Sequence, residues 1–416
     1  MYYTKLAVRN HQTTHTGKRI HPLAIVFFAV VLMVFAVFWL PRLGKPFFGH
    51  HEFNGVFFGQ IARNYVRYGL IATKGAQVLN PGTQPKSNWS LHTHHPATYP
   101  LALGAVFATL GVSETAERSL SLIASLIALI LLIRLTKSTS ALLPLLVAPL
   151  FLYYAIIPVF EPVILPFIVL ILLAYAQKNP RLLLFASLAG ILIDWPAFWF
   201  IGWIICVEVF SKNRNWHLIR AAIFGIIAGT LVNMLHLWLI VGDPIGPILD
   251  IGLYRASGMQ QPFTSVEWIR LLISRTKAFI GLPLILSSIA GTVVAFRYKK
   301  QWKLVLVTLL PALTHVIFFR NVTWYHDYVL YYSLPFIAVA TSVCLWYSYQ
   351  VTRSPIKVFG VAVVLAIATF VTTYPFYRAL ASLHSHDICV KSQTLSAEAA
   401  DQCGVFQVFY SDDFGR

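Results

Sequence analysis

Leu23 to Leu40 reads LAIVFFAVVLMVFAVFWL, an unbroken run of apolar side chains without a single charge. A helix of that length rises by about 27 Å, close to the ~30 Å thickness of a bilayer's hydrocarbon core. The residues before the run are polar and basic, and Pro41 to Lys45 after it contain no small-residue cleavage site. The stretch is therefore predicted to be a retained transmembrane helix.

The rest of the chain continues this pattern. Of its 416 residues 57% are hydrophobic and 11% are charged, with a mean hydropathy of +0.69. A soluble protein of this length would need more charge to cover its surface. We expect an all-α membrane protein with about eleven transmembrane helices. Their predicted starts are near residues 23, 116, 140, 162, 182, 196, 217, 278, 303, 326 and 356.

The basic residues are placed unevenly between the two predicted faces. The formal net charge is +17, with 32 Lys and Arg against 15 acids. If the N-terminus is cytoplasmic, about half of the basic residues fall in short cytoplasmic loops, such as Arg297 to Lys303, and Glu208 is the one acid among them. This positive-inside pattern sets the orientation and explains the charge without a nucleic-acid partner.

The topology divides the chain into four parts. We expect a basic cytoplasmic N-terminus (1–22), a first transmembrane module (23–240), a second transmembrane half (241–376) and an extracytoplasmic tail (377–416). The long outside loops are 42–115 and 242–277. Within the first loop, Phe53 to Tyr68 and Tyr99 to Leu110 are predicted to be helices on the membrane surface. The tail holds Cys389 and Cys403, which could form a disulfide outside the cytoplasm.

Three carboxylates lie where predicted helices leave the membrane on the outside face: Glu52, Glu161 and Asp194. A lone acid at a turn usually marks the boundary with water. Three such acids on one face favour a catalytic role, because ionisable groups at the membrane edge are costly and tend to be functional. A carboxylate there has the proton access that a general base needs.

The first outside loop also carries two groups of histidines, His50-His51 and His92 to His95. They could bind a metal, donate hydrogen bonds to a phosphate, or be merely tolerated at the membrane interface. Their spacings match no closed zinc pattern. No cofactor is required by the sequence; if a divalent metal is bound, Glu161 and His51 are its expected ligands.

Further polar residues complete a predicted extracytoplasmic cleft. Arg255, in the second long loop, suits a phosphate ligand. Asn54 follows the first histidine pair, and His326 and Asp327 lie in an outside turn rich in aromatic residues.

Several motifs resemble the lipid-phosphate-sugar-dependent glycosyltransferases of the GT-C superfamily. The resemblance is to the family 39-like and aminoarabinose-transferase-like enzymes, which are relatives of the protein O-mannosyltransferases. It rests on FFGQIARNYVRYG (57–69), HPATYPL (95–101), GVSETAER (111–118), FEP (160–162) and YVLYYSLP (328–335). It is clear over residues 20–200 and looser up to about residue 375.

The resemblance implies a shared helical bundle, two juxtamembrane helices in the first outside loop and a variable C-terminal half. It implies an inverting transfer of a hexose or pentose from a polyprenyl-phosphate donor to a lipid, glycan or protein acceptor outside the cytoplasm. A bacterial or archaeal plasma membrane and a role in cell-envelope glycosylation would fit. Glu161 matches the family's second acidic position. The donor phosphate would lie near His95, with His94, Arg63 and Arg255 as further contacts.

One position departs from the family pattern. Relatives carry an Asp-Glu pair where this chain has Asn54-Gly55, neither of which can act as a base. Glu52 is the nearest carboxylate and is the predicted base, with Glu161 and Asp194 as the other catalytic acids.

A transporter or lipid flippase is the alternative function. It would place polar sites near the bilayer midplane and would show duplicated halves. Here the polar residues gather at one membrane face and no internal repeat is visible, which favours an interfacial enzyme. A non-catalytic scaffold is a third reading, supported by the substitution at the first acidic position.

Overall fold

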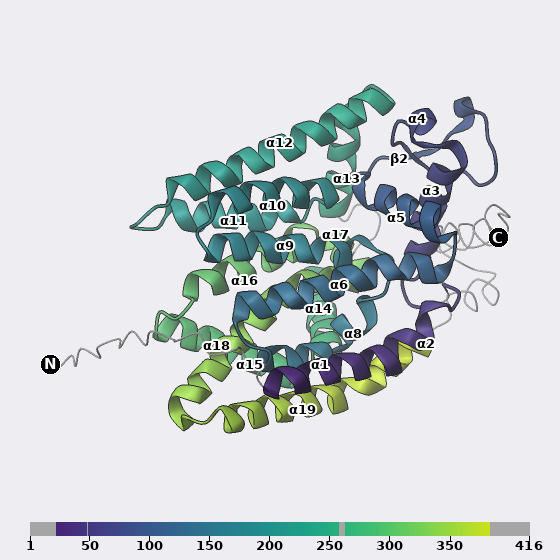
Figure 1. The fold of residues 1–416 in the computed structure, drawn as a ribbon. Helices are drawn as coiled ribbons and strands as arrows, with labels where there is room; N and C mark the ends of the chain where they lie inside the picture. Colours follow the sequence, from purple (N-terminus) through teal and green to yellow (C-terminus); the bar gives the residue numbers. More distant parts are fainter. Residues whose placement is uncertain (1–21, 48, 258–262, 383–416) are drawn as a thin grey trace, which may run out of the picture.

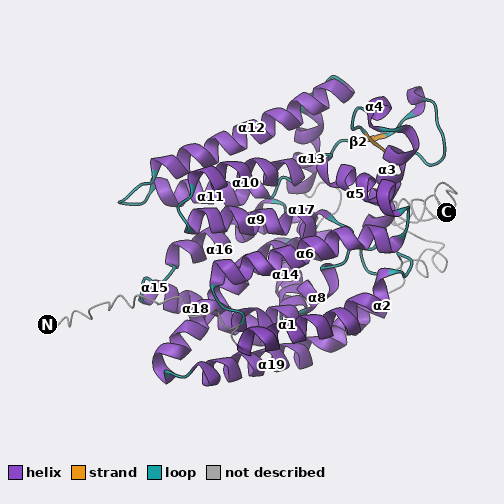
Figure 2. Cartoon of the chain, viewed as in Figure 1, coloured by secondary structure: helices purple, strands orange, loops and turns teal. Residues whose placement is uncertain are grey.

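The structure, a computed structural model, describes residues 22–47, 49–257 and 263–382. Almost all of this part is helical (Figure 2), and its one sheet is a two-residue antiparallel pairing of β1 (Gln77–Val78) with β2 (Leu91–His92). The predicted all-α membrane fold is confirmed. The Cys389–Cys403 pair lies outside the described residues.

The helices follow the chain in this order: α1 (Pro22–Val34), α2 (Leu40–Leu43), α3 (Phe53–Tyr68), α4 (Leu70–Thr73), α5 (Thr98–Leu110), α6 (Glu114–Thr136), α7 (Leu143–Leu146), α8 (Pro149–Tyr154), α9 (Phe160–Ala176), α10 (Pro180–Ile193), α11 (Ala197–Val209), α12 (Trp216–Val241), α13 (Gly246–Ser257), α14 (Ser265–Ile280), α15 (Leu282–Arg297), α16 (Trp302–Phe318), α17 (Arg320–Tyr325), α18 (Leu334–Thr352) and α19 (Pro355–Ser382). A π-helical segment (Phe35–Trp39) joins α1 to α2, and 3₁₀ turns lie at Lys86–Asn88, Ser140–Leu142 and Asp327–Ser333.

Five helical segments of the described chain are long and apolar enough to cross a membrane: Ile25–Leu43, Glu114–Thr136, Trp216–Val241, Asp327–Thr352 and Pro355–Ser382. Their apolar side chains include many that are exposed, such as Leu32, Leu231 and Val364. Exposed apolar surface on that scale is suited to lipid rather than to water. The chain is therefore an integral, multi-pass membrane protein. Shorter apolar helices such as α9, α10, α11 and α16 pack beside these segments, and nearly all residues of α9 are buried.

Two predicted spans take a different form from the one expected. The span predicted from residue 140 is a 3₁₀ turn followed by the short helices α7 and α8, and Pro144 and Pro149 lie in the first turns of these two helices. The span predicted from residue 278 begins in the last turn of α14, and α15 follows after a bend of 99°. Gly281, at φ +86°, makes the bend, and a Cβ there would lie 2.9 Å from Thr373 Cγ2.

The juxtamembrane helices α3 and α5 pack against each other at one end of the bundle, together with α4 and β2 (Figure 1). Both had been predicted from the apolar pattern of the first loop. Helix α6 runs from this end along α9, and α10 packs between α9 and α12. The second long loop contributes α13, and α14 begins with a capping box in which the Thr264 side chain and Glu267 bond each other's backbone N–H groups. Of these elements, α3, β2, α9 and α13 line the cavity described in the next subsection.

Candidate active site

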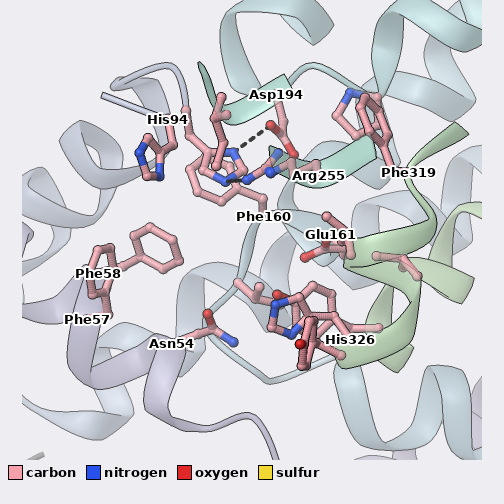
Figure 3. Close-up of a pocket in the computed structure, with 18 of the residues that line it drawn as sticks. Asn54, Phe57, Phe58, His94, Phe160, Glu161, Asp194, Arg255, Phe319 and His326 are labelled. Carbon is pink, nitrogen blue, oxygen red and sulfur yellow. Dashed lines mark hydrogen bonds and ion pairs between the residues drawn. The ribbon is translucent and has the colours of Figure 1, made fainter. Parts of the chain in front are cut away.

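A cavity of about 520 Å³ opens where the first turn of α3, the loop 91–95, the start of α9, α13 and the turn after α16 meet. Seven of the predicted site residues line it (Figure 3): Asn54, His94, His95, Glu161, Asp194, Arg255 and His326. Aromatic side chains from the same elements, among them Phe57, Phe160 and Tyr332, form much of the remaining wall. An apolar cavity with a few convergent polar groups is the usual form of a ligand site.

His95 lies between Asp194 and Arg255. Its Nδ1 donates to Asp194 Oδ1 at 2.8 Å, and its Nε2 accepts from the Arg255 guanidinium at 2.6 Å. Because arginine can only donate, this pairing assigns His95 as the neutral tautomer protonated at Nδ1. The imidazole also stacks on Phe160 with ring centroids 4.3 Å apart. The three residues form a fixed unit with the Arg255 cation beside the cavity.

Burial and the neighbouring groups together set the charge states of this unit. Burial is the main cause that lowers the pKa of His95, and the Arg255 cation lowers it further, against the opposing effect of Asp194. Burial alone would raise the pKa of Asp194, but His95, Arg255 and the backbone N–H of Trp195 together lower it. A neutral histidine therefore lies between a carboxylate and a guanidinium.

Glu161 is in the first turn of α9 and is 5% exposed. Its Oε1 accepts a hydrogen bond of 3.1 Å from the Tyr332 hydroxyl. Its Oε2 has no hydrogen-bond partner among the described residues. Figure 3 shows this carboxylate pointing into the same cavity as Arg255. Glu161 thus has one buried, unpaired carboxylate oxygen beside the cavity.

Glu52 lies outside this cavity. Its Oε1 is 3.0 Å from Arg42 and its Oε2 is 3.1 Å from Arg118, and the Gly49 N–H donates to Oε2 at 2.8 Å. Burial would raise the pKa of Glu52, but the two guanidiniums outweigh it and lower the pKa. The carboxylate lines a separate cavity of about 580 Å³ beside α2 and α19. These contacts tie the start of α3 to α2 and α6.

The remaining predicted residues also lie off the cavity wall. Arg63 is 1% exposed within α3, and its guanidinium reaches Gln60 at 3.5 Å. His51 lies beside His50 and Asp327, and these three form the one group of metal-ligand type found in the described chain. Glu161, the other expected metal ligand, is not part of that group.

Two residues of the cavity were not singled out from the sequence as site residues. Tyr332 orients Glu161, and the Asn321 side chain donates to the Tyr254 carbonyl at 3.0 Å, which holds α13 in place. The sequence pattern that indicated these two residues is the density of polar and aromatic residues between Arg320 and Pro335. That pattern indicates the region but does not assign a role to each residue.

No family model and no curated protein sequence matches the chain. The solved structures do provide a match: ArnT from Cupriavidus metallidurans bound to undecaprenyl phosphate aligns with a TM-score of 0.57, covering 94% of this chain and 77% of ArnT. The apo structure of the same ArnT aligns with a TM-score of 0.53 and covers 95% and 78%. This chain has the GT-C fold. Sequence identity is only 13% and 14%, so the likeness is one of architecture.

The GT-C fold accounts for the arrangement described above. Juxtamembrane helices at one end of the bundle and a cavity beside them were expected from the resemblance and are present in the chain (Figure 1). Glu52, the expected base, is paired with Arg42 and Arg118 and lines a separate cavity.

Proposed function

We propose that this protein is a membrane glycosyltransferase that transfers a sugar from a polyprenyl-phosphate donor to an acceptor outside the cytoplasm, with inversion at the anomeric carbon. The observation that carries the proposal is the pairing, in one cavity of a GT-C fold, of a free carboxylate oxygen on Glu161 with the Arg255–His95 unit. A transferase of this kind needs a base for the acceptor and donors for the leaving phosphate.

Arg255 is assigned to the donor phosphate. Arginine presents several N–H groups in a planar fork that suits phosphate oxygens. One of these groups already bonds His95, and His94 lines the same cavity. As the bond to the sugar breaks, negative charge grows on the phosphate, and a fixed guanidinium stabilises that charge without rearranging.

Glu161 is assigned as the base, in place of Glu52. As the acceptor hydroxyl attacks the anomeric carbon, its proton passes to Glu161 Oε2 while the polyprenyl phosphate leaves from the opposite face. One displacement inverts the configuration. Tyr332 holds the other oxygen of the carboxylate and so sets its direction. Asp194 is already bonded to His95 and Trp195, and its role is to position His95.

We assign the cavity to the outer side of the membrane from the charge distribution, because α13, which lines the cavity, lies at the end of the bundle away from the basic loop between α15 and α16 (Figure 1). The proposed acceptor is a hydroxyl group on a lipid, a glycan or a protein. The sugar is a hexose or a pentose in this proposal.

The test is a reconstituted system. The protein is placed in liposomes with an undecaprenyl-phosphate-linked sugar and candidate acceptors, and release of undecaprenyl phosphate is followed by chromatography. A transferase cleaves the phosphate–sugar bond and yields equal amounts of glycosylated acceptor. A flippase would move the intact donor between leaflets without cleaving it, and that outcome would contradict the proposal.

A further inference from the structure

His50, His51 and Asp327 come together from segments far apart in the sequence. His50 Nε2 is 2.8 Å from Asp327 Oδ2, and His51 Nε2 is 3.3 Å from Asp327 Oδ1. The candidate ligand atoms of the three residues all lie within 4.8 Å of one another. Two imidazoles and one carboxylate thus bring three ligand-type groups together.

The contact of His51 is not a hydrogen bond. Its Nε2 is buried and has no hydrogen-bond partner in the described chain, although a carboxylate oxygen is 3.3 Å away. Two ligand atoms bound at about 2.0 to 2.2 Å to one metal ion lie roughly 3 to 3.5 Å apart. The spacing and the missing hydrogen bond both fit neighbouring positions in a coordination shell.

The surrounding residues hold these side chains in place. The buried Tyr154 hydroxyl donates to Asp327, which fixes the carboxylate. The backbone at His51 has φ +57°, in the left-handed region that non-glycine residues seldom adopt. Tyr153 donates to the His50 carbonyl at 2.9 Å, and Asn54 donates to the His51 carbonyl at 2.9 Å. Partners of this kind orient the ligands of protein metal sites.

We propose that His50, His51 and Asp327 bind one divalent transition-metal ion, Zn²⁺ in preference to Mg²⁺ or Ca²⁺. Imidazole nitrogen suits Zn²⁺ and related ions, whereas Mg²⁺ and Ca²⁺ favour oxygen ligands. Three protein ligands leave a fourth position for water or substrate, as in catalytic zinc sites. His326, whose ring is 5.5 Å from that of His51, lines the main cavity, so the proposed site lies close to that cavity.

Metal content tests this inference without any transferase assay, so its failure is separate from failure of the proposed function. The detergent-purified full chain is stripped with a chelator, incubated with ZnCl₂, desalted, and analysed by mass spectrometry for metal per chain. The site predicts about one tightly held Zn²⁺ and a rise in melting temperature with zinc, because binding only to the folded state stabilises it.

Variants locate the site. His51→Ala and Asp327→Asn should each lower bound zinc at least tenfold and abolish the zinc-dependent rise in melting temperature. His217→Ala, an exposed histidine at the start of α12, should leave both unchanged. The metal-free melting temperature of each variant shows whether it is folded. Two results would contradict the proposal: the folded His51→Ala and Asp327→Asn variants retain zinc, or the wild type holds none. The cluster would then be an ion pair. Loss with His94→Ala alone would place the metal elsewhere.

Discussion

Glu161, Asp194 and Glu52 have different contacts, although all three are buried carboxylates. Glu52 has both oxygens paired with arginines, and Asp194 is bonded to His95. Glu161 lines the cavity, and its Oε2 is buried without a hydrogen-bond partner among the described residues. A base must accept a proton from a bound hydroxyl, and the unpaired oxygen is the reason why we propose Glu161 for that role.

Replacing Arg255 should weaken donor binding. A hydrogen bond to a charged group contributes about 1.5 to 3 kcal/mol, so Arg255→Ala is expected to raise the Kd for undecaprenyl phosphate roughly 10- to 100-fold. Binding is measured by fluorescence quenching in detergent. Arg270→Ala, an exposed arginine on α14, is the control and should bind normally. Equal affinity for the two variants would remove Arg255 from the phosphate site.

The histidines of the first loop should make stability depend on pH. Burial lowers the pKa of His92 and of His95 in the folded chain below the ordinary value near 6.5. The unfolded chain therefore takes up protons below about pH 6.5 that the folded chain does not, and the free energy of unfolding falls as the pH falls. His95→Gln should reduce that slope, as measured by melting temperatures from pH 7.5 to 5. An unchanged slope would mean that His95 is protonated when folded.

Some of these residues could be predicted from the sequence, and others could not because their contacts are not local. Glu161 and Asp194 interrupt apolar runs. Placing a carboxylate in a membrane costs free energy, so such residues indicate a functional role. The bond from Tyr332 to Glu161 joins residues 171 positions apart, and no local pattern encodes it. Glu52 was predicted to be the base because the sequence could not show its ion pairs. The two arginines that pair with it lie on other helices, α2 and α6.

Among the helices, α15 and α18 make an unusually close crossing. At Gly291 an added Cβ would lie 1.8 Å from the Ala340 carbonyl oxygen, which is backbone and has little freedom to shift. Ser287 and Ser288 lie near Thr341 at the same crossing, at hydroxyl separations of 3.1 and 3.5 Å. Small residues allow this approach in membranes, where packing drives helix association.

Gly291→Ala should therefore destabilise the protein by about 1 to 3 kcal/mol, the usual effect of overpacking. Gly202→Ala, on α11, is the matched control, because nothing lies within 4 Å of its added Cβ. The comparison is made by thermal unfolding in detergent. If Gly291→Ala melts no lower than Gly202→Ala, the crossing is looser than described.

Helix existence was easier to predict than helix continuity. The apolar runs correctly indicated membrane helices, and the pattern of Phe53 to Tyr68 indicated α3. The same runs could not show that α14 and α15 meet at 99°, because the bend depends on Gly281 fitting against Thr373 of α19. Pro144 and Pro149 did carry a local signal of broken helix, which the length of the apolar run obscured.

At the scale of the whole molecule, the proposed function depends on which side of the membrane the cavity faces. In a cysteine-free background, a cysteine at Lys300, between α15 and α16, should react with a membrane-impermeant maleimide only after cells are opened. A cysteine at Lys86, in the first long loop, should react in intact cells. Both positions are exposed, so access depends on the side of the membrane. The reverse labelling pattern would place the cavity in the cytoplasm.

The central claim is that Glu161, not Glu52, is the base of a sugar transfer from a polyprenyl phosphate. It is tested most directly by comparing transfer rates of Glu161→Gln and Glu52→Gln with wild type in liposomes at saturating donor. Glu161→Gln should fold, bind undecaprenyl phosphate and transfer ~10²–10⁴-fold more slowly. Glu52→Gln should lose stability, by about 3 to 5 kcal/mol for a broken buried ion pair, while its folded fraction transfers at nearly the wild-type rate. Near-normal transfer by Glu161→Gln with loss in folded Glu52→Gln would contradict the account.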